Sequence, residues 1–170
     1  MSTALLAHDF KLTTKHIHIG IWDEFCDGVY IPKEKQVILC ANTLIEQKDF
    51  ENALHRQLIK LYDDVRSTNY NFSNCKHLAC SEVRAALFSH KCNSSEMRFS
   101  KLQTNTRRNE KREADNYWLK SVASESLKEK PLWAKHADEF IHSIFEKCSK
   151  DRSPFGDAQI TKTRSLTDIL

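Results

Sequence analysis

Three polar side chains in the segment Leu54–Arg66 stand where a helix can present a catalytic or metal-binding face. Residues four apart on a helix share a face, so Arg56 and Lys60 project the same way, next to Gln57. Two histidines at this spacing hold a metal ion, and a glutamate beside the first polarises its bound water. Arginine and lysine are poor metal ligands, and an amide cannot act as a base. The segment therefore predicts a helix without metal or acid–base chemistry at these positions.

Two other interpretations of the histidines do not restore such a site. Shifting the register by one residue puts His55 in the first position, but Ile59 then falls in the second. His16 and His18 alternate along a predicted strand and share one face, with no third ligand near them in the sequence. We interpret that pair as part of a solvent-exposed strand face.

The cysteines offer two further alternatives. Cys75, His77, Cys80 and Cys92 are ligand types that zinc accepts, but their spacing lacks the close Cys-x-x-Cys pair of structural zinc sites. His77 and Cys80 lie three residues apart on a predicted helix, so a thiol nucleophile beside an imidazole base is the second alternative. Both stay hypotheses at the level of sequence.

Several short segments follow one another in the order found in one known family. They are Cys26-Asp27-Gly28, Gln36–Cys40, Leu58-Ile59 with Asp63 and Arg66, His77–Ala86 with Cys92, and Phe145–Cys148 followed by Pro154-Phe155-Gly156. From about Cys26 to Gly156 the chain resembles the mitochondrial ATP synthase assembly-factor metallopeptidases, also known as Ku-binding proteins. That family consists of zinc proteases with a His-Glu-x-x-His helix, whose metal-binding and catalytic positions correspond here to Arg56, Gln57 and Lys60. The resemblance implies a degenerate, zincin-like domain.

Loss of a metal ion changes the charge balance of such a site. A carboxylate left there without a counter-ion costs several kcal/mol when it is buried, so it must be protonated or paired. We expect Arg56 or Lys60 to replace zinc electrostatically by pairing with Glu82 or Asp63. The alternatives are a cleft that opens to water or to a partner, and exposed salt bridges from Lys60 along its own helix.

Length and composition indicate one globular domain. The 170 residues are 40% hydrophobic and 29% charged, with three glycines and three prolines. We assign residues 1–156 to the degenerate metallopeptidase domain and residues 157–170 to a polar C-terminal tail. The net charge of +3 is too small to indicate nucleic acid. Acidic residues interrupt the basic cluster at residues 107–112, which favours a solvated or protein-facing surface over RNA or anionic lipid.

Hydrophobic periodicity predicts an α+β fold, with a small N-terminal antiparallel sheet followed by a mostly helical remainder. Ile17, Ile19 and Ile21 alternate and are expected to face the core from one strand. Pro131 is expected to open the last helix. The predicted strands span residues 15–22, 29–31 and 36–40, and the predicted helices span about 42–66, 76–89, 96–126 and 131–148.

The cysteine count fits two interpretations. Up to three disulfides would suit an oxidising compartment, and buried free thiols are the alternative. The sequence does not determine which cysteines pair. The six candidates are Cys26, Cys40, Cys75, Cys80, Cys92 and Cys148.

The resemblance supplies the functional hypotheses. The first is a catalytically inactive pseudo-metallopeptidase without a cofactor, an accessory subunit of ATP synthase or the respiratory chain on the intermembrane-space side of the mitochondrial inner membrane. The second is a free assembly factor for ATP synthase biogenesis, or a protein associated with the mitochondrial ribosome. The third is an enzyme that uses another set of residues. For the first two, we expect protein subunits as partners. No stretch approaches the roughly 18 apolar residues of a membrane span, and the N-terminal segment, which lacks arginine, makes a poor matrix-targeting helix.

Overall fold

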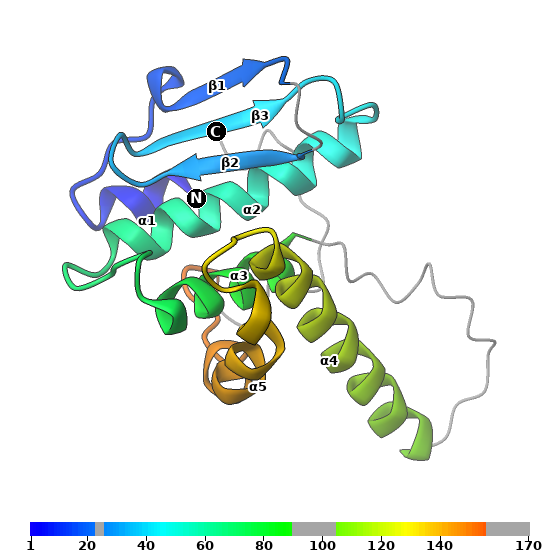
Figure 1. Ribbon diagram of the computed structural model, residues 1–170. Helices are drawn as coiled ribbons and strands as arrows, with labels where there is room; N and C mark the ends of the chain where they lie inside the picture. Colours follow the sequence, from blue (N-terminus) through cyan, green and yellow to red (C-terminus); the bar gives the residue numbers. More distant parts are fainter. Residues whose placement is uncertain (23–25, 90–104, 156–170) are drawn as a thin grey trace.

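The computed structural model describes residues 1–22, 26–89 and 105–155, with the backbone alone for residues 105–112. Its elements are α1 (Ser2–Leu6), a 3₁₀ turn (Thr14–His16), β1 (Ile17–Gly20), β2 (Gly28–Ile31), β3 (Gln36–Cys40), α2 (Gln47–Val65), α3 (Cys75–Phe88), α4 (Asn105–Lys128), a second 3₁₀ turn (Ala134–His136) and α5 (Ala137–Cys148). The sheet lies over α2, and α2 lies over the group formed by α3, α4 and α5 (Figure 1). This arrangement confirms the predicted α+β class.

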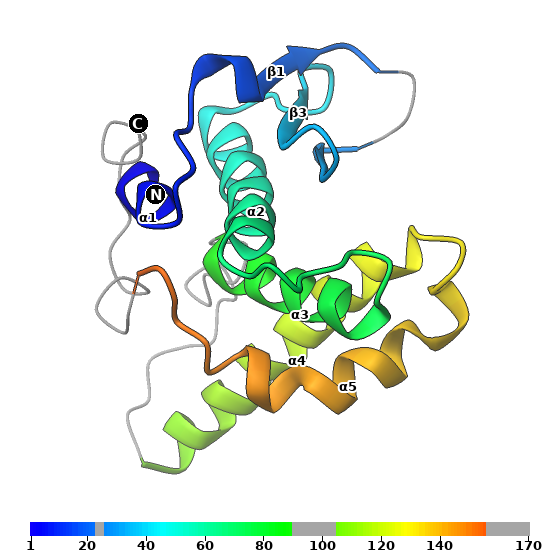
Figure 2. The same cartoon turned by 90° about the vertical axis from the view of Figure 1, so that its left-hand side faces the viewer.

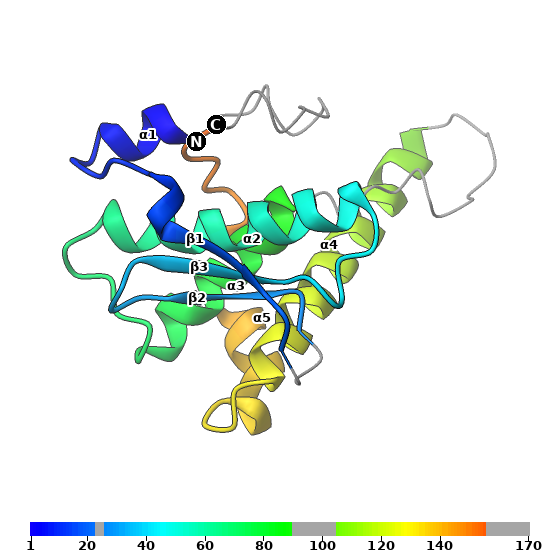
Figure 3. The same ribbon diagram turned by 90° about the horizontal axis from the view of Figure 1, so that it is seen from above.

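The sheet has the strand order β1-β3-β2, so β1 and β2 are its edges within the described residues. The antiparallel pairing predicted for the sheet is confirmed for β2 and β3, which form a hairpin across the turn at residues 32–35. β1 joins β3 in parallel, which makes the sheet mixed. The expected burial of Ile19 and Ile21 is wrong, since they are 61% and 83% exposed. β1 is an edge strand, and its end runs past the helix that covers the sheet (Figure 3).

Helix α2 covers the sheet with the apolar stripe that the sequence predicts. It begins at Gln47 rather than near residue 42, because Glu46 has an extended backbone and forms a reciprocal capping box with Asp49. Its polar face turns toward α3 and α4, and this face carries the candidate residues. The buried apolar side chains of α2 are Ala53, Leu54, Leu58, Ile59, Leu61 and Tyr62.

Helix α3 lies between two apolar clusters, one shared with α2 and the sheet, the other with α4 and α5 (Figure 2). Asn74 caps its start by accepting a hydrogen bond from the backbone N–H of Lys76 at 3.0 Å. The small side chains of Ala79, Ala85 and Ala86 are no more than 1% exposed. Small residues let neighbouring helices approach α3 from more than one side, so its polar residues become buried between those helices.

Helices α4 and α5 close the second cluster. Leu119, Ala123 and Leu127 of α4 pack there with Ile141 and Phe145 of α5. The last helix begins at Ala137, not at Pro131, because the segment between them forms turns and a short 3₁₀ helix. The side chains of the basic cluster at 107–112, the first part of the helix predicted from residue 96, and the 157–170 tail lie outside the described residues.

Two disulfides link parts of the described chain. Cys26 and Cys40 join the segment before β2 to the end of β3, and Cys80 and Cys148 join α3 to the end of α5. Cys75 is a free thiol, and Cys92 lies outside the described residues. The second bridge spans 68 residues and fixes the last helix to the central one.

Candidate functional site

A cavity of about 850 Å³ lies between the edge strand β2 and the helices. Its walls come from β2, from the polar face of α2, from α3, from the C-terminal half of α4 and from the segment at residues 129–133. Arg56, Gln57 and Lys60 all line it, so the three candidate residues of α2 do share one face. Trp118 and Leu132 add apolar surface to the lining and are 39% and 83% exposed.

An ion pair between α2 and α3 lies in the wall of this cavity. The ammonium nitrogen of Lys60 is 2.7 Å from Oε1 of Glu82, and these side chains are 12% and 1% exposed. The alternative in which Lys60 forms exposed bridges to Asp63 and Asp64 is wrong, because both aspartates have other partners. Asp64 contacts Lys35 at 2.5 Å, and Asp63 contacts arginines.

Ser126 of α4 and Arg56 complete the polar cluster around Glu82. The Ser126 hydroxyl donates to Oε2 of Glu82 at 2.8 Å and accepts a hydrogen bond from Nη2 of Arg56 at 3.0 Å. Arg56 also lies 3.6 Å from a carboxylate oxygen of Asp27, which precedes β2. The side-chain amide of Gln57 donates to the carbonyl of Gly28 at 3.0 Å, so it ties α2 to the edge strand.

Burial and charge act against each other on the two ionisable partners. Burial alone would raise the pKa of Glu82, but Lys60, Arg56 and the Ser126 hydroxyl outweigh it, so the pKa lies below its ordinary value. Burial lowers the pKa of Lys60, and the attraction of Glu82 compensates only in part. A carboxylate with a depressed pKa is a weak general base. The cluster therefore presents paired charges at the cavity wall rather than a base poised near neutral pH.

The residues of this cluster do not fit a zinc ion. Zinc in proteins is bound by cysteine, histidine and carboxylate side chains, and the α2 positions hold a guanidinium, an amide and an ammonium. Within the described residues, no group of three such ligands is positioned to hold a metal ion. The Lys60 nitrogen also lies 2.7 Å from the Glu82 carboxylate of α3, at hydrogen-bonding distance.

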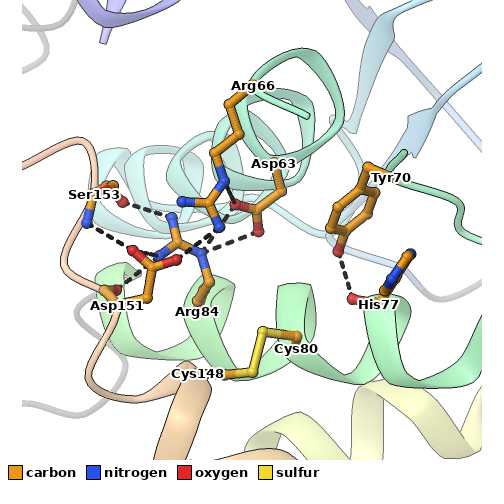
Figure 4. A network of polar contacts seen from close by, with 9 residues as sticks. All are labelled: Asp63, Arg66, Tyr70, His77, Cys80, Arg84, Cys148, Asp151 and Ser153. Carbon is orange, nitrogen blue, oxygen red and sulfur yellow. Dashed lines mark hydrogen bonds and ion pairs between the residues drawn. A yellow bond between two sulfur atoms is a disulfide. The ribbon is translucent and has the colours of Figure 1, made fainter. Parts of the chain in front are cut away.

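A second polar cluster lies between α2 and α3 on the side toward the end of the described chain (Figure 4). Nε of Arg84 contacts both carboxylate oxygens of Asp63, at 3.0 and 3.2 Å. Its terminal nitrogens donate to the carbonyls of Asp151 at 2.7 Å and of Ser153 at 2.5 Å. Arg66 joins Asp63 at 3.2 Å and Asp151 at 2.7 Å. Arg84 is completely buried, so this cluster fixes the segment after α5 to the interior.

The structure removes both cysteine alternatives. Cys80 is bonded to Cys148, so it is neither a thiol nucleophile nor a zinc ligand (Figure 4). His77 instead accepts a hydrogen bond at Nδ1 from the backbone of Asn71, and its carbonyl accepts one from the Tyr70 hydroxyl. The sequence analysis counted Cys80 and Cys148 among the disulfide candidates but could not pair them, because they lie 68 residues apart on different helices.

The structure defines the class of protein. It is an α+β fold in which a cleft lies between a sheet edge and the helix that carries Arg56, Gln57 and Lys60. Comparison with known families makes this specific. Residues 1–156 match the Peptidase M76 family, and the chain belongs to that family. No solved structure matches the chain.

Several similar proteins are named as ATP23 proteases of the mitochondrial inner membrane. The chain is 28% identical over 156 residues to the mitochondrial inner membrane protease atp23 of Schizosaccharomyces pombe, a match that covers 91% of this chain and 81% of that protein. It is 30% identical to the mitochondrial inner membrane protease ATP23 homologues of Danio rerio and Homo sapiens, over 137 and 136 residues. These matches cover 78% and 80% of this chain but 52% and 53% of the two vertebrate proteins. The chain thus spans about half the length of those relatives.

These findings contradict two of our predictions. The chain was expected not to be an enzyme, and to be an inactive accessory subunit of ATP synthase or the respiratory chain. A peptidase family and relatives named as proteases point to an enzyme instead, and nothing in the comparisons indicates a structural subunit. The prediction went too far because it inferred the activity of the whole chain from the side chains of one helix. Unsuitable ligands argue against zinc at one position, but they do not exclude peptide hydrolysis by other groups.

The sequence analysis missed three polar residues of the two clusters. Ser126 was hidden in a highly charged helix, Asp151 in the turn after the last helix, and Arg84 was considered only as a neighbour of Glu82. Helix α4 has no clear apolar periodicity, so no local signal marked Ser126 as an interior residue. The other two have partners far away in the sequence, which no local pattern indicates.

Proposed function

We propose that this chain acts on polypeptides at the mitochondrial inner membrane, as a protein of a peptidase family, and that it takes them into the cleft beside β2. Membership of the Peptidase M76 family and the names of the relatives support the class of activity and the location. Polypeptides of inner-membrane complexes are the substrates or partners that we expect.

The observation that carries the proposal is the edge strand in the wall of the cavity. β2 pairs with β3 on one side, and its residues Gly28, Val29 and Tyr30 line the cavity on the other. An exposed sheet edge recruits an extended peptide through main-chain hydrogen bonds, while neighbouring pockets accept alternate side chains. Charged and hydroxyl groups from α2, α3 and α4 face the same space, together with the apolar surface of Trp118 and Leu132. A mixed lining of this kind suits a peptide, which presents both backbone amides and apolar side chains.

We further propose the intermembrane-space side of the inner membrane as the place of action. The two disulfides support it, because disulfides form and persist in oxidising compartments and are rare in reducing ones. Among the described residues, no helix combines the length and the hydrophobicity that a membrane crossing requires. Thiol labelling of intact mitoplasts, with a reagent that does not cross the inner membrane, tests this location. Cys80 and Cys148 should react with the reagent only after reduction.

Site-specific photo-crosslinking tests the cleft directly. A photoreactive residue at Val29 should crosslink to unfolded inner-membrane polypeptides that are added to the purified chain, because Val29 lines the cavity. The matched control carries the same residue at Lys33, which is exposed in the turn after β2. Equal crosslinking from the two positions would contradict binding in the cleft.

Cleavage of the same polypeptides is measured in parallel. Fragments that disappear when Val29→Arg fills the cleft support a peptidase that works there, and Lys33→Arg should leave them unchanged. Crosslinking without fragments would limit the proposal to binding, and fragments unaffected by Val29→Arg would place the activity elsewhere.

A further inference from the structure

We propose that the ammonium group of Lys60 replaces a metal ion in this cleft. It pairs with Glu82 at the position where a His-Glu-x-x-His helix would bind its metal ion, so the cleft works without a divalent metal. The inference deepens the proposed function, because it concerns the same cleft. Its test reads metal content and thermal stability, so its failure and the failure of polypeptide binding can be told apart.

The geometry of three positions carries the inference. Positions 56 and 60 lie four residues apart on α2, and both reach the same acidic cluster. Lys60 contacts one carboxylate oxygen of Glu82 at 2.7 Å, while Arg56 reaches the other through the Ser126 hydroxyl, with hydrogen bonds of 3.0 and 2.8 Å. The two positions that a metal-binding helix uses for its histidines thus converge on a carboxylate from a later helix. In this chain, cationic side chains fill those positions.

The balance of charge explains why the cleft needs no metal ion. Glu82 is 1% exposed, and an ionised carboxylate that is buried without a counter-ion is strongly unfavourable. Arg56 and Lys60 bring two positive charges, and Glu82 and Asp27 bring two negative charges, so these four groups together are neutral. Lys130 adds a further positive charge close enough to influence Lys60. A divalent cation would have to displace the ammonium group and would then add positive charge to a cluster that is already compensated.

The Ser126 hydroxyl supports this arrangement. The hydroxyl donates a hydrogen bond to Oε2 of Glu82 and accepts one from Arg56. Because Lys60 contacts Oε1, both oxygens of the carboxylate have partners within the chain. The cluster is therefore closed by side chains from α2, α3 and α4.

Metal analysis of the purified full chain tests the inference. The chain is dialysed against zinc chloride, washed, and measured by inductively coupled plasma mass spectrometry. We expect no stoichiometric zinc and the same Tm in zinc and in EDTA. Stoichiometric zinc, or a Tm that falls in EDTA, would overturn the inference. This result does not depend on whether the variants described next are folded.

The variant Arg56→His/Gln57→Glu/Lys60→His tests whether the positions converge as described. With the cations removed, we expect it to bind one zinc ion per chain and to gain Tm when zinc is added. Adding Glu82→Gln should weaken the zinc affinity at least about tenfold, because it removes the carboxylate that faces the new ligands. Circular dichroism establishes that the variants are folded. A folded variant without zinc, or an affinity unchanged by Glu82→Gln, would contradict the convergence on Glu82.

Discussion

Two ion-pair clusters connect α2 to α3, and they differ in what surrounds them. In the first, Lys60 meets Glu82 in the wall of the cavity, with the lysine 12% exposed. In the second, Asp63 meets Arg84, which is not exposed at all and uses its remaining donors on backbone carbonyls. The positive charge belongs to α2 in the first cluster and to α3 in the second. The first cluster borders the cavity, and the second contacts only the chain itself.

The two clusters differ in that one is enclosed by the fold and the other borders a cavity. The guanidinium of Arg84 has protein partners on each of its nitrogens, so its geometry is fixed by the fold. Lys60 has a single carboxylate partner at 2.7 Å and borders a cavity of about 850 Å³. A buried pair with all donors used resists change, whereas a pair beside a cavity can respond to what enters. The predictions below follow from this difference.

Replacing Arg84 should have the largest effect. Arg84→Met leaves the buried carboxylate of Asp63 with Arg66 alone and leaves the carbonyls of Asp151 and Ser153 without their donor. Breaking a buried pair by removing one partner costs about 3–5 kcal/mol, and we expect a loss near the upper end, about 4–5 kcal/mol. Urea denaturation followed by circular dichroism measures it. A loss below about 1 kcal/mol would show that this cluster does not hold the fold.

Replacing Lys60 should cost less, because the Ser126 hydroxyl and the positive charge of Arg56 still compensate Glu82. We expect Lys60→Met to lower the free energy of unfolding by about 2–3 kcal/mol. The double variant Lys60→Met/Glu82→Met removes both charges, so it should be more stable than the single variant. If the double variant loses the sum of the two single losses, the two side chains are not coupled, and the pair has no special role.

The pH dependence of stability distinguishes the charge of Glu82 from its packing. Burial alone would raise the pKa of Glu82, but Lys60 and Arg56 outweigh this effect. The pKa of Glu82 in the folded chain therefore lies below the ordinary 4.5. Ionised Glu82 therefore stabilises the fold above about pH 4.5, and this contribution is lost as the pH falls through the depressed pKa. The Tm difference between the native chain and Glu82→Gln should shrink between pH 6 and about pH 3. A constant difference would mean that the charge contributes nothing.

The smallest effect is expected at a surface pair that serves as the control. Lys150 and Glu146 lie one helical turn apart at 3.3 Å, and each is 77% exposed. Solvent screens such pairs, so Lys150→Met should change stability by less than about 0.5 kcal/mol. The same denaturation measurement applies. A larger effect would show that charge in general, rather than buried charge, controls the stability of this chain.

Local patterns predicted the elements, but they did not predict the contacts between distant segments. The stripe through Leu54, Leu58 and Leu61 identified α2 because helical periodicity is a property of one segment. The hairpin was predictable for the same reason. The parallel pairing of β1 and the start of α2 were not, since the first depends on a non-local partner and the second on a capping box.

For the polar clusters, sequence reasoning named Arg56, Gln57, Lys60 and Glu82 but missed several of their partners. Glu82 was among the expected partners of Lys60, because a lost metal ion leaves a carboxylate that needs a counter-ion. Asp63, the other expected partner, is held by Arg84 and Arg66 instead. Ser126 came from a helix with no clear apolar periodicity, so nothing local marked it. The functional inference then went beyond the site, and the family match corrected it.

Crystallographic zinc detection at Glu82 is the most direct test of the central claim. Crystals of the native chain grown with zinc chloride are measured on both sides of the zinc absorption edge. We predict no anomalous peak near Glu82 and electron density for Lys60 within hydrogen-bonding distance of its carboxylate. An anomalous peak at Glu82, with Lys60 displaced into the cavity, would contradict the account.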